Sequence, residues 1–207
     1  MEKDRGMTLP IDEGVGQIRD KLVVLGIDRK TLVLFFSDNG ANGAHATAYP
    51  GNADGKYLAS FDNSLENRGL PNSFIDMGPS WAQASSAPFR LFKSFTSQGG
   101  IKAPLIVKTP GSMAGAGQWS HAFLHVTDIM PTFLEVAGAT YPQTLDGRSI
   151  RQPIGRSMVP ILTGEQDRIR ENEAVVYELF EMRAYIQDDW KLLLQISTDD
   201  DTGMMWG

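Results

Sequence analysis

One stretch of the sequence decides the fold: Thr31-Leu32-Val33-Leu34-Phe35-Phe36-Ser37-Asp38-Asn39-Gly40. Residues 31–36 form a continuous apolar run, which predicts a strand buried on both faces, as in the middle of a parallel sheet. The run stops at residue types that favour turns. Because ligands bind beyond the carboxyl ends of the strands in open α/β sheets, this stretch predicts an α/β fold with a ligand near residues 37–40.

The flanking sequence continues this α/β pattern. Before the strand, apolar residues recur at helical spacing up to Gly26, which fits a C-terminal cap. They are Val15, Ile18, Leu22 and Leu25. Beyond the strand we expect a second buried strand at 104–108 and helices at 128–137 and 157–162. Two parallel strands are too few to make a covered sheet, so the chain is predicted to be part of a larger domain.

Residues 41–90 show no sustained periodicity and are rich in Asn, Ser, Gly and Pro. A segment of this length inside a domain indicates functional loops or a lid. A mobile surface insertion is the alternative interpretation.

The last part of the chain changes character. Short runs of strand-like composition at 174–179, 182–187 and 190–196 predict a small antiparallel sheet. Trp190, Leu192, Leu194 and Ile196 alternate, so we expect them on the one face that packs. This change divides the chain into residues 1–165 and 166–207.

Composition excludes several classes of function. The chain has 207 residues, 42% of them hydrophobic, and a net charge of -6 without a basic stripe, so nucleic acid is not the expected partner. It has no apolar run long enough to span a membrane, and its first residues do not resemble a signal peptide. We expect a soluble protein, cytoplasmic or periplasmic. The absence of cysteine excludes a disulfide framework, a zinc–thiolate site and a cysteine nucleophile within these residues.

Asp38 and Asn39 place a carboxylate and an amide oxygen side by side at a strand end. Oxygen ligands of this kind bind calcium or magnesium, although two of them do not complete a site. An Asx turn is the equally plain alternative for this tetrapeptide.

Lys93 is a second candidate, because it lies shortly before Gly99-Gly100, a turn at which backbone can approach a ligand closely. Such a lysine would bind an oxyanion and neutralise charge on a leaving group. A solvated surface lysine is the common alternative.

Further motifs follow these residues in a fixed order through nearly the whole chain. They are Asp38-Asn39-Gly40-Ala41, Asp62-Asn63-Ser64-Leu65-Glu66-Asn67, Gly78-Pro79-Ser80-Trp81-Ala82-Gln83-Ala84, Lys93 with Gly99-Gly100-Ile101, Ser120-His121-Ala122-Phe123, 128–138, Glu178-Leu179-Phe180, Met182-Arg183-Ala184 and Asp189-Trp190-Lys191. In content, order and spacing they resemble the sulfatase family, specifically arylsulfatases of the type found in Pseudomonas.

The resemblance implies an alkaline-phosphatase-like α/β fold, with a partial parallel sheet, flanking helices and a small antiparallel C-terminal sheet. Residues 1–165 would belong to the catalytic domain and 166–207 to the small subdomain. It implies hydrolysis of small-molecule sulfate esters at a calcium-bound formylglycine. Asp38 and Asn39 match the family's late pair of calcium ligands, and Lys93 matches the lysine that binds the substrate's sulfate in catalysis.

The family's formylglycine motif, Cys/Ser-x-Pro-Ser/Ala-Arg, lies upstream of the matched region. We therefore expect this chain to be a C-terminal half that is inactive alone and needs the missing N-terminal half to complete its sheet and site. Ser86-Ala87-Pro88-Phe89-Arg90 resembles the motif, but it follows the metal pair and has Phe in the fourth position, so it is interpreted as a decoy.

Other departures from the family pattern are Asn42, Gln98, Lys102 and Ala103. Lys102 keeps a positive charge where the family has arginine, but loses the bidentate fork. The chain has three histidines. We expect His121 and His125 to be structural and His45 to be a lesser candidate for substrate contact.

Two other functions remain open. A site for a tetrahedral oxyanion does not choose sulfur over phosphorus, so a phosphate or phosphonate monoester hydrolase of the same superfamily is one alternative. A non-catalytic protein that binds cations or oxyanions is the other.

Overall fold

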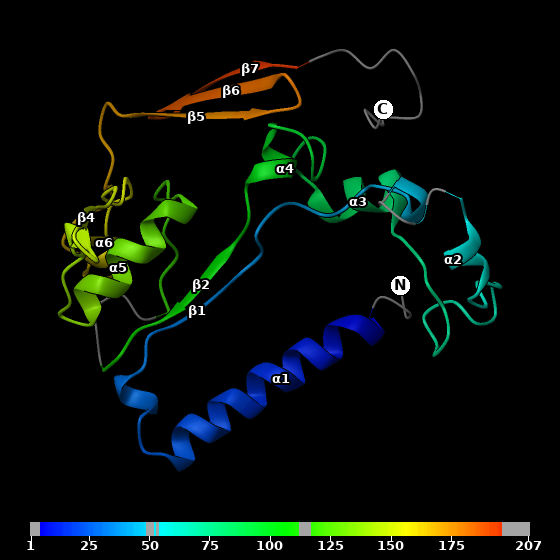
Figure 1. The fold of residues 1–207 in the computed structure, drawn as a ribbon, viewed down its shortest axis with the longest axis horizontal. Helices are drawn as coiled ribbons and strands as arrows, with labels where there is room; N and C mark the ends of the chain where they lie inside the picture. The colour runs from blue at the N-terminus through cyan, green and yellow to red at the C-terminus, as the bar shows by residue number, and fades with distance from the viewer. Residues whose placement is uncertain (1–4, 49–51, 53, 112–116, 196–207) are drawn as a thin grey trace. The chain divides into compact units, whose positions relative to one another are not determined.

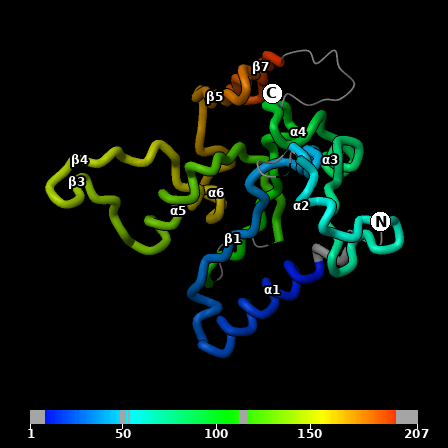
Figure 2. Tube along the Cα trace, turned by 45° about the vertical axis from the view of Figure 1, so that its right-hand side comes forward, coloured from blue at the N-terminus to red at the C-terminus, as the bar shows by residue number. Residues whose placement is uncertain are grey.

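Strand β1 (Val33–Phe36) forms within the predicted apolar run, and β2 (Leu105–Lys108) forms at the second predicted position. The two lie side by side in a two-stranded sheet (Figures 1 and 2). The predicted burial on both faces is not observed, since Phe35 and Phe36 are 47% and 40% exposed. In the part of the chain that the structure describes, this sheet has only two strands. A sheet this narrow offers little area for helices to pack on, so its side chains stay exposed.

The structure is a computed structural model that describes residues 5–48, 52, 54–111 and 117–195. The chain divides into two units. Unit 1 comprises Met1–Lys21, Phe36–Leu105 and Ala174–Gly207, and unit 2 comprises Leu22–Phe35 and Ile106–Glu173.

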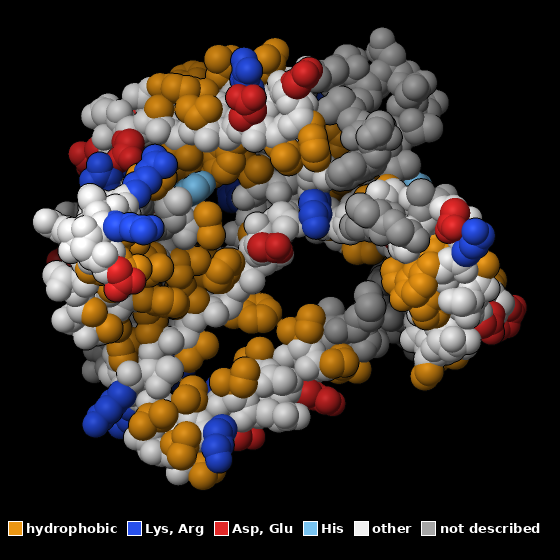
Figure 3. All heavy atoms as spheres, viewed as in Figure 1, with side chains coloured by type: hydrophobic (Ala, Val, Ile, Leu, Met, Phe, Trp, Pro, Cys, Tyr) orange, Lys and Arg blue, Asp and Glu red, His pale blue; other side chains and the backbone are white. Residues whose placement is uncertain are grey.

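Helix α1 (Arg5–Val24) confirms the predicted first helix, and Gly26 ends it with a left-handed φ of 68°. Several of its apolar side chains are exposed, as Figure 3 shows, with Ile18 61% and Val23 58% exposed. None of the helices in the described residues is both long and apolar enough to cross a membrane.

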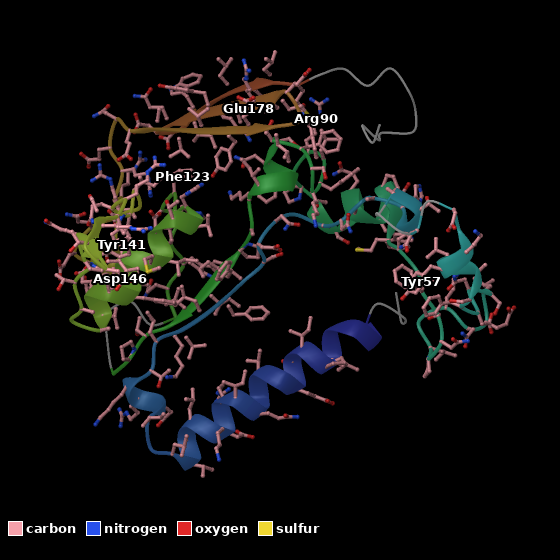
Figure 4. The ribbon with its side chains drawn as sticks, in the orientation of Figure 1. Tyr57, Arg90, Phe123, Tyr141, Asp146 and Glu178 are labelled. Carbon is pink, nitrogen blue, oxygen red and sulfur yellow. The ribbon has the colours of Figure 1, made fainter. Side chains whose placement is uncertain are left out.

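In unit 1, the segment that showed no periodicity contains short elements. They are η2 (Ala46–Ala48), α2 (Lys56–Ala59) and α3 (Gly78–Ser86). Helix α4 (Gln98–Ile101) follows the segment. Tyr57, labelled in Figure 4, packs edge-on against Phe61 and Phe74, with ring centroids 5.1 and 5.8 Å apart. Small aromatic and polar clusters, not a long amphipathic face, therefore order this segment.

The predicted antiparallel sheet is present as β5 (Ala174–Leu179), β6 (Met182–Gln187) and β7 (Trp190–Leu194). Its covered face is opposite to the one we expected. Met182 and Ala184 are buried, whereas Trp190 and Leu192 are 84% and 74% exposed. The register explains this, because Leu192 pairs with the exposed Tyr185, while Leu193 pairs with the buried Ala184.

Unit 2 contains the remaining elements. They are η1 (Asp28–Lys30), η3 (Val126–Asp128), α5 (Ile129–Val136), β3 (Thr144–Leu145), β4 (Arg148–Ser149) and α6 (Val159–Thr163). Helix α5 falls within its predicted range of 128–137, and α6 overlaps its predicted range of 157–162 but ends one residue beyond it. The hairpin of β3 and β4, with Asp146 in its turn (Figure 4), was not predicted because each strand has only two residues.

Candidate active site

Asp38 and Asn39 lie directly after β1, where the sequence predicts them. Asp38 is exposed and Asn39 is half-buried. Ser37 stabilises this turn, because its hydroxyl donates a hydrogen bond to the Asn39 carbonyl at 2.8 Å. Within the described residues, neither the Asp38 carboxylate nor the Asn39 amide makes a side-chain hydrogen bond or ion pair, so the alternative Asx turn is not formed. Both oxygens are available to a ligand.

Two backbone hydrogen bonds join this turn to the loop that carries Lys93. The Gly40 amide donates to the Gly100 carbonyl, and the Lys93 amide donates to the Ala41 carbonyl, both at 2.9 Å. A Cβ on Gly40 would lie 1.7 Å from the Gly99 carbonyl oxygen, so only glycine permits this approach. Segments more than fifty residues apart are thereby brought together, including all three predicted site residues.

The Lys93 side chain is half-buried. In the regions that the structure describes, its ammonium makes no hydrogen bond or ion pair. The residues around it adopt an uncommon backbone, with positive φ at Leu91 (63°) and Ser94 (80°). Such conformations cost about 1 kcal/mol or more each and concentrate at functional sites. The loop thus holds an unpaired cation at a conformational cost.

The Gly99-Gly100 pair lies in close contact with backbone of its own loop. A Cβ on Gly99 would lie 1.8 Å from the Leu91 carbonyl oxygen. The pair therefore allows the loop to approach its own backbone closely, and the Gly99 amide donates to the Arg90 carbonyl at 2.9 Å. Arg90 itself (Figure 4) lies on the connection between α3 and α4.

His45 lies in the loop that follows the Asp38–Asn39 turn. Its Nδ1 is 3.6 Å from an Asp76 carboxylate oxygen, and the other oxygen of that carboxylate accepts from the Ala46 amide at 2.7 Å. The His45 side chain is 49% exposed. It is therefore an oriented and accessible histidine of the same unit.

His125 has the structural role that we expected. Its ring Nδ1 accepts from the Thr127 amide at 3.3 Å, and its own amide donates to Asp128, which together cap η3. Burial lowers the pKa of His125, nearby Asp128 raises it, and Arg170 lowers it. The net direction favours the neutral ring that this cap requires. His121 is exposed.

A buried ion pair in unit 2 was missed from the sequence. Asp128 is fully buried and accepts hydrogen bonds from both terminal nitrogens of Arg170, one of them at 2.7 Å, and from the Arg156 amide at 2.9 Å. Burial raises the pKa of Asp128, but the hydrogen bonds from Arg170 and from backbone amides outweigh this effect and leave the pKa below its ordinary value. The only signal in the sequence was an aspartate at a helix start.

The decoy serine and Lys102 have plain structural surroundings. The Ser86 hydroxyl is buried at the end of α3 and has no partner in the described part of the chain, so it is not accessible to a substrate. Lys102 places its ammonium 4.8 Å from the centre of the Phe89 ring. This cation–π contact replaces any bidentate pairing that an arginine would make there.

The donor chemistry of the Asp38–Asn39 turn fits calcium, but the number of donors does not complete a site. Calcium takes about six to eight oxygens. Among the described residues there is no group of three or more Asp, Glu, His or Cys side chains placed to hold a metal. The turn supplies two oxygens of the required kind.

The sequence of the chain is similar to those of known proteins. Residues 5–139 match the model of the sulfatase family. The chain belongs to the sulfatase family. Residues 89–191 also match the model described as N-sulphoglucosamine sulphohydrolase, C-terminal. The match to the sulfatase model spans β1, β2, the Asp38–Asn39 turn and the Lys93 loop.

Individual sulfatases are similar over most of the chain. An uncharacterized sulfatase of Schizosaccharomyces pombe is 36% identical over 93% of the chain, which is 35% of that protein. An arylsulfatase of Klebsiella aerogenes is 33% identical over 78% of the chain and 34% of its own length. Mouse N-acetylgalactosamine-6-sulfatase is 32% identical over 66% of the chain and 20% of its length. The match thus covers about a third of the first two relatives.

Proposed function

We propose that the chain contributes to sulfuric ester hydrolysis, with Asp38 and Asn39 as metal ligands and Lys93 binding the sulfate of a small-molecule ester. One observation carries the proposal. Two backbone hydrogen bonds of 2.9 Å hold the turn of Asp38 and Asn39 against the loop of Lys93, and among the described residues none of these three side chains has a hydrogen-bond or ion-pair partner. Membership of the sulfatase family and similarity to the Klebsiella aerogenes arylsulfatase support the same activity.

Lys93 has the properties that binding of a sulfate ester requires. The substrate carries negative charge on its sulfate oxygens, and further charge develops on the leaving oxygen as the ester bond breaks. A half-buried ammonium attracts that charge more strongly than a solvated one, because the surrounding dielectric is lower. Lys93 needs no rearrangement of an existing ion pair before it binds.

Calcium is the metal that the two oxygens suit best. When bound, it would supply positive charge that polarises the sulfate oxygens. In this proposal the remaining calcium ligands and the formylglycine aldehyde come from outside these 207 residues. The chain alone would then bind part of the substrate without turnover.

The proposal extends to architecture. β1 and β2 would be neighbouring parallel strands of an alkaline-phosphatase-like sheet. Residues 1–165 would belong to the catalytic domain, and 166–207 would begin the small C-terminal subdomain. The motifs support the arylsulfatase subtype found in Pseudomonas.

The test uses the protein expressed from its intact gene, assayed on 4-nitrophenyl sulfate and 4-nitrophenyl phosphate. We expect faster hydrolysis of the sulfate, and a loss of about 100-fold or more in kcat/KM for Lys93→Met, since an oxyanion-binding group is removed. Lys56→Met is the control, because the Lys56 side chain is 88% exposed and its ammonium pairs with Asp54 at 3.3 Å. Faster hydrolysis of the phosphate would make the protein a phosphate monoesterase. Full activity of Lys93→Met would refute the role of Lys93.

A further inference from the structure

Lys191 connects the small antiparallel sheet to the Lys93 loop. It lies on β7 and its ammonium donates to the Thr96 carbonyl at 2.7 Å, across 95 residues of sequence. Its cross-strand partner on β6 is Ile186, which is buried. Lys191 therefore projects from the covered, largely apolar face of the sheet.

This position is unfavourable for an ammonium group unless the contact compensates. Burial lowers the pKa of Lys191. Among the described residues, no carboxylate pairs with this side chain, and the Thr96 carbonyl is its hydrogen-bond acceptor. Lys191 lies on an apolar face and has no carboxylate partner among the described residues. A polar group in such a place needs its hydrogen bond, which indicates that Lys191 serves to hold the Thr96 carbonyl.

The acceptor belongs to the segment that determines where Lys93 lies. Thr96 is three residues after Lys93 and two before α4. Thr96 and Ser97 are 1% and 2% exposed, yet neither hydroxyl has a hydrogen-bond partner in the described part of the chain. Their side chains thus do not anchor the segment through hydrogen bonds. The Lys191 contact does so from a separate element.

We infer that Lys191 is a positioning residue for Lys93, through which the small sheet holds the sulfate-binding loop in place. The ammonium fixes the Thr96 carbonyl, and with it the backbone between the left-handed Ser94 and the glycine pair. Lys191 does not touch the substrate. The effect of Lys191 on sulfate binding rests on the proposed function. The contact between Lys191 and the Thr96 carbonyl does not depend on that function.

The loop contact is tested first, by amide hydrogen exchange in the 207-residue chain. Lys191→Met should speed exchange of the Lys93, Gly99 and Gly100 amides by about tenfold or more, because local opening becomes easier. Exchange in β5 and β6 should stay unchanged. Lys108→Met is a matched control, since it removes another lysine–carbonyl bond, from Lys108 to Asp28 at 2.5 Å.

The absence of cysteine from the sequence allows a rescue experiment. Lys191→Cys can be alkylated with bromoethylamine, which restores an ammonium on a side chain of nearly the same length. Restored protection of the Lys93 loop is expected. Unchanged exchange in Lys191→Met, or a loss of protection throughout unit 1 that alkylation does not reverse, would overturn the inference.

The effect on the proposed reaction is measured separately, in the protein expressed from its intact gene. Lys191→Met should lower kcat/KM for 4-nitrophenyl sulfate by about tenfold, mainly through KM, because a displaced Lys93 binds the sulfate less well. Lys191→Arg should recover part of the loss, and Lys108→Met should match the unmodified protein. An unmodified protein without sulfatase activity would refute the proposed function, and hydrogen exchange would still decide the role of Lys191. Unaltered kinetics in an active Lys191→Met protein would refute its positioning role.

Discussion

At the scale of single residues, the candidate site depends on backbone contacts that glycine permits. The Asp38–Asn39 turn and the Lys93 loop share no side-chain hydrogen bond in the described residues, and their junction consists of backbone amides and carbonyls. The sequence predicted that the three candidate side chains, Asp38, Asn39 and Lys93, lie beside turns. It predicted neither the junction nor its geometry, because a backbone hydrogen bond leaves no mark on residue type except the required glycine.

Gly40→Ala should weaken this junction. Its Cβ would lie 1.7 Å from the Gly99 carbonyl oxygen, so backbone must move. We expect a loss of about 1–3 kcal/mol in the free energy of unfolding, as for other overpacked sites, measured by urea denaturation. Gly14→Ala in α1 is the control, because its Cβ meets no atom within 4 Å. Equal stabilities of the two variants would contradict the close approach.

Asp128→Asn tests the buried ion pair of unit 2. Removing this charge takes from Arg170, whose side chain is only 6% exposed, its fully buried carboxylate partner, so we expect a loss of about 3 kcal/mol or more at pH 7. The exposed Asp12→Asn should change stability by less than about 0.5 kcal/mol. Urea unfolding of both variants measures these differences.

The pH dependence of the same variant has a defined sign. Because the folded pKa of Asp128 lies below its ordinary value, its stabilisation is present above the pKa of the unfolded state and is lost as pH falls through the folded pKa. The stability difference between the unmodified chain and Asp128→Asn should therefore shrink in acid. A difference that stays constant down to about pH 2 would exclude ionised Asp128 as its source.

At the scale of elements, periodicity predicted what depends on local pattern. The ranges of β5 and β6 were predicted to the residue, and α5 lies within its predicted range. The prediction of which face of the sheet is covered was wrong, because alternation defines two faces but does not say which of them another segment covers. Helix α3 was missed because it is short and its buried positions, Gly78 and Ala82, are small.

The two faces of the sheet should respond differently to substitution. Met182 is 2% exposed, so Met182→Ala should cost about 2–5 kcal/mol through lost burial and a cavity. Trp190 is 84% exposed, and Trp190→Ser should change the free energy of unfolding by less than about 0.5 kcal/mol. Thermal or urea unfolding compares them. A larger loss of unfolding free energy for Trp190→Ser than for Met182→Ala would mean that the covered face is the one predicted from the sequence.

At the scale of the whole chain, the site is assembled from segments far apart in sequence. The Asp38–Asn39 turn, the Lys93 loop and Lys191 on β7 meet within unit 1. The family could be identified from the sequence, because the motifs resemble those of sulfatases in content, order and spacing. The connection through Lys191 could not be predicted, because a lysine in an alternating strand is ordinarily assigned to the solvent face.

The small number of candidate metal ligands in the Asp38–Asn39 turn gives the last prediction. Two oxygens from Asp38 and Asn39 fall well short of the six or more that calcium needs, so the 207-residue chain should bind calcium no more tightly than about 1 mM in a calorimetric titration. Asp38→Asn is the matched variant, because it removes one ligand charge at an exposed position. Micromolar binding that Asp38→Asn abolishes would mean that these residues complete the site themselves. Binding that survives the substitution would belong to other carboxylates and would separate calcium from the Lys93 loop.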